Sequence, residues 1–201
     1  EEAAAVPLVF LTAWHMLVSR AQLREGEWVL VHAAGSGVGS AAVQIAKLLG
    51  ATVIATARGE AKLEAAKALG ADHVIDYEKQ DFLAEAKKLT GKRGVDVVFE
   101  HVGKDTWEKS ILSLTAGGRL VTCGATTGWD AVTDLRYVFY KKLSLLGSTM
   151  GSRGELHDIL QRVERGQLKP VIAKTLPLSA AAEGHRLLEE RGGFGKVVFE
   201  I

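Results

Sequence analysis

The sequence has few of the residues that cross-link, kink or anchor a chain. Its 201 residues include one cysteine, three prolines and two methionines. The single cysteine, Cys123, can form neither an internal disulfide nor a cysteine-rich zinc cluster within this chain. The apolar runs read as too short to span a bilayer, and the first residues do not show the pattern of a signal peptide. These absences predict a cytoplasmic protein.

The chain also lacks an excess of charge of either sign. It carries 25 Lys and Arg against 24 Asp and Glu, a formal net charge of +1. A chain so balanced has no broad attraction to nucleic acid or to anionic lipid. We therefore expect a small-molecule substrate and neither a nucleic-acid nor a membrane partner. The opening stretch, EEAAAVPLVF, reads as the interior of a helical region, which predicts a piece of a longer protein.

What the sequence does contain is a regular alternation of short apolar runs and helical patterns. The near-continuous Val/Ile/Leu runs indicate strands that are buried on both faces. Their alternation with helices predicts right-handed βαβ units in a doubly wound parallel α/β sheet. The predicted strands cover 28–33, 52–56, 73–77, 95–99, 119–123 and 143–147, with helices at 38–49, 60–69, 82–89 and about 106–114. Beyond residue 151 the pattern loosens into helices at 155–164 and 180–190 and strands at 171–176 and 196–200.

A glycine-rich stretch, HAAGSGVGS, joins the first predicted strand to the first long helix. The first amides of a helix have no partner within the helix, and the helix dipole adds positive charge there, so a pyrophosphate fits such a turn. Two frames are open: Gly35, Gly37 and Ser40, or small residues at 34 and 36 followed by Gly39. The second frame gives Gly39 the role of close helix–sheet packing, and we favour it. A purely structural turn is the alternative.

Several stretches resemble the medium-chain dehydrogenase/reductase superfamily, closest to its quinone oxidoreductase and alcohol dehydrogenase-like branches. They are HAAGSGVGSAAVQIAKLLGATVIATA, FLTAWHML, ALGADHVIDY, GVDVVFEHVG, GGRLVTCGATTG, LLGSTMG and FGKVVFE, in family order. The resemblance implies that residues 1–201 are the Rossmann-type, C-terminal cofactor-binding domain of an NAD(P)H-dependent oxidoreductase. Residues 1–24 and 170–201 would border an absent N-terminal catalytic domain.

The end of the second predicted strand bears on which nicotinamide cofactor is bound. An NAD site usually has an acidic residue there, about 20 residues past the glycine turn, to bind the ribose. This chain has Ala57 at that position, followed by Arg58, with Lys62 one helical turn on. Arginine suits a phosphate group, so we predict NADP(H). NAD(H) stays open, because Glu60 could reach a ribose and Arg58 could be a solvated loop cation.

The resemblance also implies further cofactor-binding residues. Tyr77 would flank the adenosine end, or else be a half-buried strand tyrosine. Lys196 would touch the pyrophosphate, or else be an exposed cation. His101 is expected to shape the nicotinamide site rather than to act in catalysis, and no catalytic residue is assigned. The complete predicted set is Thr12, Ser36, Gly37, Val38, Ala57, Arg58, Lys62, Tyr77, His101, Val102, Gly124, Ala125, Leu146 and Lys196.

No catalytic zinc is expected in this chain. Zinc-dependent relatives carry a Cys or acidic ligand four residues before the position of Thr12, and this chain has Leu8 there, which cannot coordinate a metal. Cys123 is predicted to be a small core residue at a strand end. A structural zinc in the absent domain stays open.

The sequence thus predicts an oxidoreductase that transfers hydride between a nicotinamide and a quinone, enone or alcohol/carbonyl substrate. This domain alone would be inactive, because the acceptor pocket would lie against the absent domain. The alternatives are an NAD-dependent alcohol dehydrogenase, a non-enzymatic nucleotide-sensing module, or a methyltransferase of similar fold. A homodimer is predicted through the apolar edge strand at 143–149, unless the aromatic segment before it covers that edge.

Overall fold

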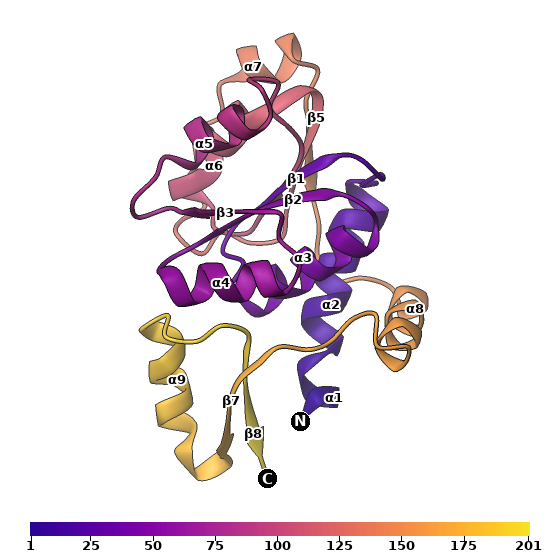
Figure 1. Cartoon of the computed structure of the whole chain (residues 1–201), viewed down its shortest axis with the longest axis vertical. Helices are drawn as coiled ribbons and strands as arrows, with labels where there is room; N and C mark the ends of the chain where they lie inside the picture. The colour runs from indigo at the N-terminus through magenta and orange to yellow at the C-terminus, as the bar shows by residue number, and fades with distance from the viewer.

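The computed structural model describes all 201 residues, and its centre is a six-stranded parallel sheet. The strands lie in the order β3-β2-β1-β4-β5-β6, and every pair is parallel. This is the doubly wound, Rossmann-type sheet that the alternation predicted (Figure 1). Its strands are β1 (Trp28–Val31), β2 (Thr52–Ala57), β3 (His73–Asp76), β4 (Val95–Glu100), β5 (Leu114–Thr122) and β6 (Ser144–Gly147).

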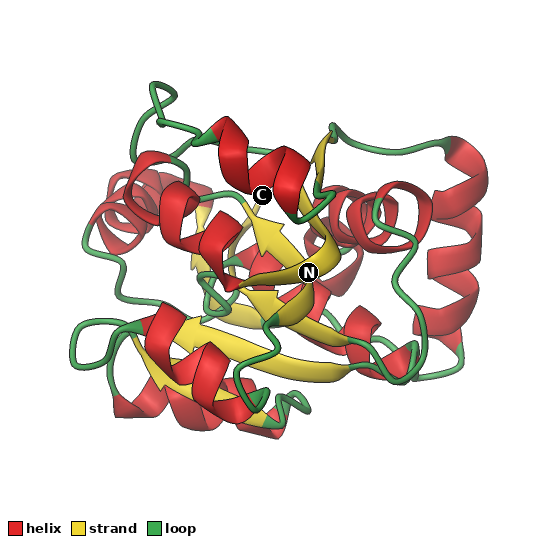
Figure 2. Ribbon diagram, turned by 90° about the horizontal axis from the view of Figure 1, so that it is seen from above, coloured by secondary structure: helices red, strands yellow, loops and turns green.

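Helices cover both faces of the sheet (Figure 2). Within each strand, alternate side chains point to opposite faces, and the two faces have separate cores. Val29 and Val31 belong to the core under α3 (Gly37–Leu48), whereas Leu30 belongs to the core under α5 (Phe82–Leu89) and α6 (Lys104–Ser113). The remaining helices of this part are α4 (Glu60–Ala68) and α7 (Leu135–Tyr140).

The predicted elements match the structure to within a few residues, except that the helix α7 was not predicted and the fifth strand differs more widely. The fifth strand begins at Leu114 rather than at the expected position 119. Its early part contains Gly117 and Gly118, which carry no apolar side chain, so an apolar pattern could not reveal it. Its pairing with β4 is irregular between Val95 and Val97.

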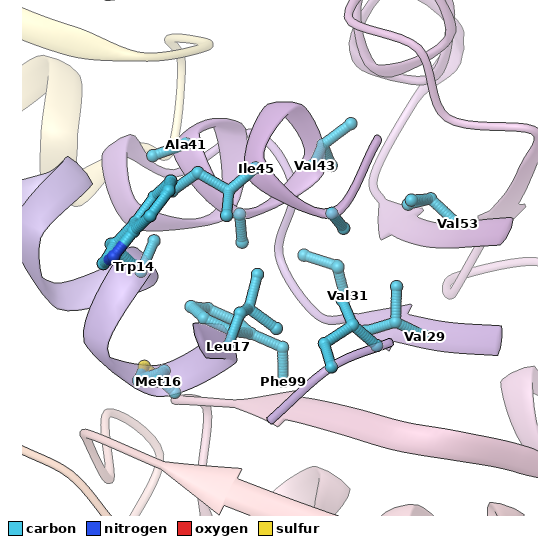
Figure 3. Packing of buried hydrophobic residues seen from close by; sticks show 14 of the residues in the cluster. Trp14, Met16, Leu17, Val29, Val31, Ala41, Val43, Ile45, Val53 and Phe99 are labelled. Carbon is cyan, nitrogen blue, oxygen red and sulfur yellow. The ribbon is translucent and has the colours of Figure 1, made fainter. Parts of the chain in front are cut away.

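The N-terminal segment is a core helix of this domain. It runs through α1 (Glu2–Ala5), α2 (Pro7–Trp14) and a π-helical stretch, η1 (His15–Arg20). Figure 3 shows Trp14 beside α3 and Leu17 beside Phe99 of β4, all in one buried cluster.

This segment corrects the expectation about apolar runs. Residues Glu2–Arg20 form one helix of 19 residues with mean hydropathy 1.4, which is long and apolar enough to cross a membrane by length and composition alone. Half of its most apolar window is buried inside the protein. The apolar pattern did not reveal this length, because the polar His15 and Ser19 interrupt the apolar run while the helix continues across them.

The C-terminal part forms a separate small lobe. After α8 (Arg153–Glu164), the strands β7 (Ile172–Pro177) and β8 (Lys196–Glu200) pair in parallel, with η2 (Leu178–Ala180) and α9 (Ala181–Glu189) between them. This lobe lies beside α1, away from the main sheet (Figure 1). Thr175 Oγ1 donates a hydrogen bond to Glu1 at 3.0 Å. That residues 1–24 and 170–201 border another domain remains a prediction.

Candidate functional site

The strand order creates one place where neighbouring loops diverge. β1 lies between β2 and β4, so the connection after β1 leads to one side of the sheet and the connection after β4 crosses to the other. Ligands of open α/β sheets bind in the crevice at the carboxyl ends of such strands. The glycine-rich turn follows β1 at this point, and the predicted residues from the other five strands follow along the same edge.

The glycine-rich turn leads into a helix N-terminus that has free backbone amides. Ser36 caps α3, and its hydroxyl accepts the amide of Gly39 at 2.9 Å. Gly37 and Val38 are the first two residues of the helix, so their amides have no partner within it. Two unpaired amides and the positive end of a 12-residue helix suit an anionic group.

Gly39 is the residue of this turn that cannot carry a side chain. A Cβ placed there would lie 2.3 Å from the carbonyl oxygen of Ala33 and 2.9 Å from Cα of Ala34. At Gly35 the nearest atoms would belong to side chains, Phe194 at 3.3 Å and Lys62 at 3.4 Å. The tight backbone contact therefore belongs to Gly39, as the favoured frame requires.

The C-terminal lobe reaches the same turn. The amide of Gly195 donates to the carbonyl of Gly35 at 2.8 Å. The Lys196 side chain passes over Gly37, where a Cβ would lie 2.6 Å from its Cδ. Lys196 is thus a cation held next to the free amides, although it lies 157 residues along the chain from Gly39.

Three cations gather beyond the end of β2. Arg58 donates to the carbonyl of Glu190 at 3.3 Å and pairs with Glu78 at 3.6 Å, and Lys62 donates to the carbonyl of Arg191. Burial lowers the pKa of the Lys62 ammonium, and the positive charges of Arg58 and Arg191 lower it further. Arg191 was not predicted, because it lies 129 residues from Lys62 and no local motif marks it.

Ala57 and Tyr77 lie at the edge of this cluster. Ala57 ends β2, is buried, and accepts the amide of Tyr77 at 3.3 Å. Tyr77 follows β3 and is 39% exposed. Ala57 carries no carboxylate, so the acidic side chain paired with this cluster is Glu78 and not a residue at the end of β2.

A second region, the apolar cavity, lies between α2, the start of α3 and the segments that follow β5 and β6. It has a volume of about 260 Å³ and is lined mostly by apolar side chains. Two predicted residues, Thr12 and Val38, line it. Its full lining is Leu8, Val9, Thr12, Val38, Cys123, Thr149 and Met150.

Cys123 differs from the expectation of a core residue. It follows β5, is half-buried, and lines the apolar cavity. Burial raises the pKa of its thiol, so the sulfur is held in its neutral form. The strand end was located correctly, but the opening beside it comes from α2, which the sequence could not place.

The loops after β4 and β5 are tied together. Thr126 Oγ1 donates to the carbonyl of His101 at 3.0 Å. The amide of Thr127 donates to the carbonyl of Val102 at 2.7 Å. A Cβ at Gly124 would lie 3.1 Å from the His101 carbonyl oxygen. Ala125, next along the same loop, is exposed, and Leu146 of β6 packs partly against the core.

A chain of buried polar groups, not foreseen from the sequence, runs beneath these loops. Thr56, His32 and Glu100 stand at the ends of β2, β1 and β4 with 1%, 1% and 0% exposure. Ser110 of α6 lies between His32 Nε2 and Glu100 Oε2, at 2.9 Å and 3.0 Å. Burial lowers the pKa of His32 to about 4, despite the attraction of Glu100. Burial opposes ionisation of Glu100, but His32, Thr106 and two backbone amides hold its pKa below the usual value.

The arrangement does not fit a zinc centre in this chain. No group of three His, Cys, Asp or Glu side chains comes together closely enough to hold a metal ion. Leu8, at the position where zinc-dependent relatives are expected to have a ligand, lines the apolar cavity instead.

A six-stranded sheet in this order, with a glycine-rich turn at its switch point, defines a Rossmann-type α/β domain. A family model described as zinc-binding dehydrogenase matches residues 37–165. The chain belongs to that family, and the predicted membership in the medium-chain dehydrogenase/reductase superfamily is confirmed.

Individual relatives cover the chain almost completely. A crystal structure of an NAD-dependent alcohol dehydrogenase is 54% identical, with a TM-score of 0.95 over 100% of this chain and 59% of that one. A 2-haloacrylate reductase from a Burkholderia species is 36% identical over 97% of this chain and 62% of the reductase. A 2-octenoyl-CoA carboxylase reductase in complex with NADP and 2-octenoyl-CoA is 34% identical, with a TM-score of 0.88 over 98% of this chain and 48% of that one. The chain thus spans about three fifths or less of these proteins.

The contact at Gly39 predicts a difference between two glycine substitutions. Gly39→Ala is expected to destabilise the protein by about 1–3 kcal/mol, because its Cβ meets backbone that cannot move aside. Gly35→Ala, the matched control, should cost less than about 1 kcal/mol, because flexible side chains can yield. Urea unfolding of both variants measures this, and a larger loss at Gly35 would contradict the frame.

Buried His32 predicts a loss of stability in acid. The unfolded chain, where histidine has a pKa near 6.5, binds a proton that the folded protein does not bind until about pH 4. The free energy of unfolding therefore falls between pH 6.5 and pH 4, by on the order of 3 kcal/mol for this group. Urea unfolding at several pH values gives the free energy of unfolding as a function of pH. This free energy should change less steeply with pH in His32→Gln than in the unaltered protein, and an equal pH dependence in both would refute the assignment.

Proposed function

We propose that this chain is the NADP(H)-binding domain of an oxidoreductase. The observation that carries the proposal is that the protein has two separate regions suited to anions. One is formed by the free amides of Gly37 and Val38, and the other by the cluster of cations at the end of β2. A dinucleotide with an additional phosphate on its adenosine ribose carries negative charge at both places.

Each group then has a defined role. The amides of Gly37 and Val38, with Lys196, bind the pyrophosphate. Arg58 and Lys62, with Arg191, bind the 2′-phosphate. The exposed Arg58–Glu78 pair is weak, so a phosphate dianion displaces Glu78 from the guanidinium.

The nicotinamide end lies at the apolar cavity. Thr12 and Val38 line that cavity and would orient the ring and exclude water from one of its faces. His101, Val102, Gly124, Ala125 and Leu146 would line the path from the pyrophosphate to it. The bound cofactor supplies or accepts the hydride.

The substrate is a quinone, an enone or an alcohol/carbonyl compound. The similarity to a 2-haloacrylate reductase and to a 2-octenoyl-CoA carboxylase reductase supports a compound with an activated double bond. The similarity to an NAD-dependent alcohol dehydrogenase supports an alcohol, and with it the NAD(H) alternative. The acceptor site is completed by a catalytic domain, as the partial coverage of these relatives supports. A nucleotide-sensing module would use the same cofactor residues without that domain.

The cofactor assignment predicts tighter binding of NADPH than of NADH. Arg58→Ala should narrow the ratio of the two dissociation constants by about tenfold, because it removes a charge-assisted phosphate contact. Lys67→Ala, an exposed cation on the same helix as Lys62, is the control and should leave the ratio unchanged. Calorimetric titration measures both constants. Equal affinities in the unaltered protein, or tighter NADH binding, would reverse the assignment to NAD(H).

We also propose a homodimer through the β6 edge. β6 ends the sheet, so one of its edges has no neighbouring strand. The aromatic segment does not bury itself over this edge: Phe139 and Tyr140 of α7 are 70% and 84% exposed. Both side chains belong to the segment that directly precedes β6 in the chain, and they would pack against their counterparts in the dimer.

The dimer proposal predicts a change of mass on one substitution. Phe139→Glu should convert a dimer into a monomer, because it places two charges in an apolar contact. Leu178→Glu, at a 55% exposed site in the C-terminal lobe, should leave the dimer intact. Sedimentation velocity distinguishes the species. A monomeric unaltered chain at all concentrations tested would refute the proposal.

A further inference from the structure

We infer that Glu100 is a positioning residue for the nicotinamide, because its buried carboxylate holds the backbone of the loop formed by residues 101–103. This inference rests on the proposed function, in which that loop lies along the nicotinamide half of the cofactor.

One oxygen of the carboxylate holds the loop. Glu100 Oε1 accepts the amide of Val102 at 2.6 Å and the amide of Gly103 at 3.1 Å. Gly103 has a φ of +97°, and a Cβ there would lie 2.7 Å from the carbonyl oxygen of Gly128. The loop thus turns at a residue that only glycine can occupy, with both turning amides directed onto one acceptor.

The other oxygen fixes the carboxylate itself. Glu100 Oε2 accepts the hydroxyl of Thr106 at 2.7 Å and that of Ser110 at 3.0 Å. The side chain is fully buried and receives four donors, which is the number a carboxylate can accept. It has no free oxygen with which to meet a ligand, so its influence on a cofactor passes through the loop.

The neighbouring groups set the direction of the hydrogen bonds. Because a carboxylate only accepts, Ser110 donates to Glu100 and must accept from His32 Nε2, at 2.9 Å. His32 therefore carries a proton on Nε2. Because burial lowers its pKa to about 4, the ring is neutral near pH 7, and its Nδ1 accepts from Thr56 Oγ1 at 3.3 Å. Thr56 Oγ1 in turn accepts the amide of Ala33 at 3.2 Å. The carboxylate is thus bonded to the buried polar chain of Ser110, His32 and Thr56 on one side and to the loop amides on the other.

His101 adds a second contact between the loop and this buried polar chain. Its Nε2 donates to the carbonyl of His32 at 3.0 Å, and its ring packs edge-on against Phe99. The first loop residue is therefore held from below, and the next two are held by Glu100. The backbone that would meet the nicotinamide ribose is fixed before any ligand arrives.

The test compares two ligands that share the adenosine half. NADPH reaches the nicotinamide side, whereas adenosine 2′,5′-bisphosphate does not. Glu100→Leu removes both acceptors from the loop amides. It should weaken NADPH binding by about tenfold and leave binding of the bisphosphate within about twofold. A merely structural role would weaken both ligands alike.

The conservative variant supplies the rescue. In Glu100→Gln one amide oxygen can still accept Val102 and Gly103, while Thr106 and Ser110 turn to accept from the new NH₂ group. NADPH affinity should therefore return to within about threefold of the unaltered protein. Glu64→Gln, an exposed position on α4, is the control and should change neither affinity.

The outcomes are distinguishable by calorimetric titration, with circular dichroism to verify folding. If the unaltered chain binds neither ligand, the proposed function fails. If it binds both, and Glu100→Leu weakens them equally or not at all, only the inference about Glu100 is overturned. Should Glu100→Leu not fold, Glu100→Asp replaces it. Its shorter side chain draws the carboxylate away from the amides, so NADPH binding should weaken by at least about threefold without a change for the bisphosphate.

Discussion

The structure depends on one close approach of backbone to backbone, at Gly39. The first turn of α3 lies against the end of β1 so tightly that a single methyl group would collide with the Ala33 carbonyl. This contact directs the helix N-terminus across the carboxyl edge of the sheet. The free amides of Gly37 and Val38, the cover of α2 over α3, and the apolar cavity beside Val38 all follow from that direction. Ala33 itself has a φ of +46°, a conformation that costs free energy for a residue with a side chain. The partly buried hydrogen bond from its amide to Thr56 Oγ1 helps to hold it there.

The sequence predicted the sheet well because the strands are buried on both faces. Such strands appear as unbroken apolar runs, and the glycines that end the helices mark the boundaries between them. The start of β5 was missed because Gly117 and Gly118 carry no such signal. The extent of the N-terminal helix was not visible in the sequence, because polar residues interrupt its apolar run. In both places the backbone continues an element that the side-chain pattern does not.

The site was predicted unevenly, for a related reason. Residues that follow strands, such as Arg58 and Tyr77, are located by the strand pattern, because parallel strands end at one edge. Arg191 and the link from Glu100 to His32 could not be found in this way. They come together only through the return of the C-terminal lobe and the packing of α6 on β4. Buried polar groups in particular give no periodic signal, since a single Glu or His interrupts a strand pattern without indicating what it bonds.

The return of the C-terminal lobe to the glycine-rich turn has a thermodynamic consequence. Gly195 is bonded to Gly35, and Lys196 lies over Gly37, so the start of β8 and the start of α3 share one surface. A ligand held on that surface contacts both segments, and its binding free energy is added to whatever keeps β8 in place. The hydrogen bond from Gly195 to Gly35 closes a loop of some 160 residues, so the start of β8 can separate from the turn or stay docked on it. Separation of β8 from the glycine-rich turn and release of the ligand are then parts of one equilibrium.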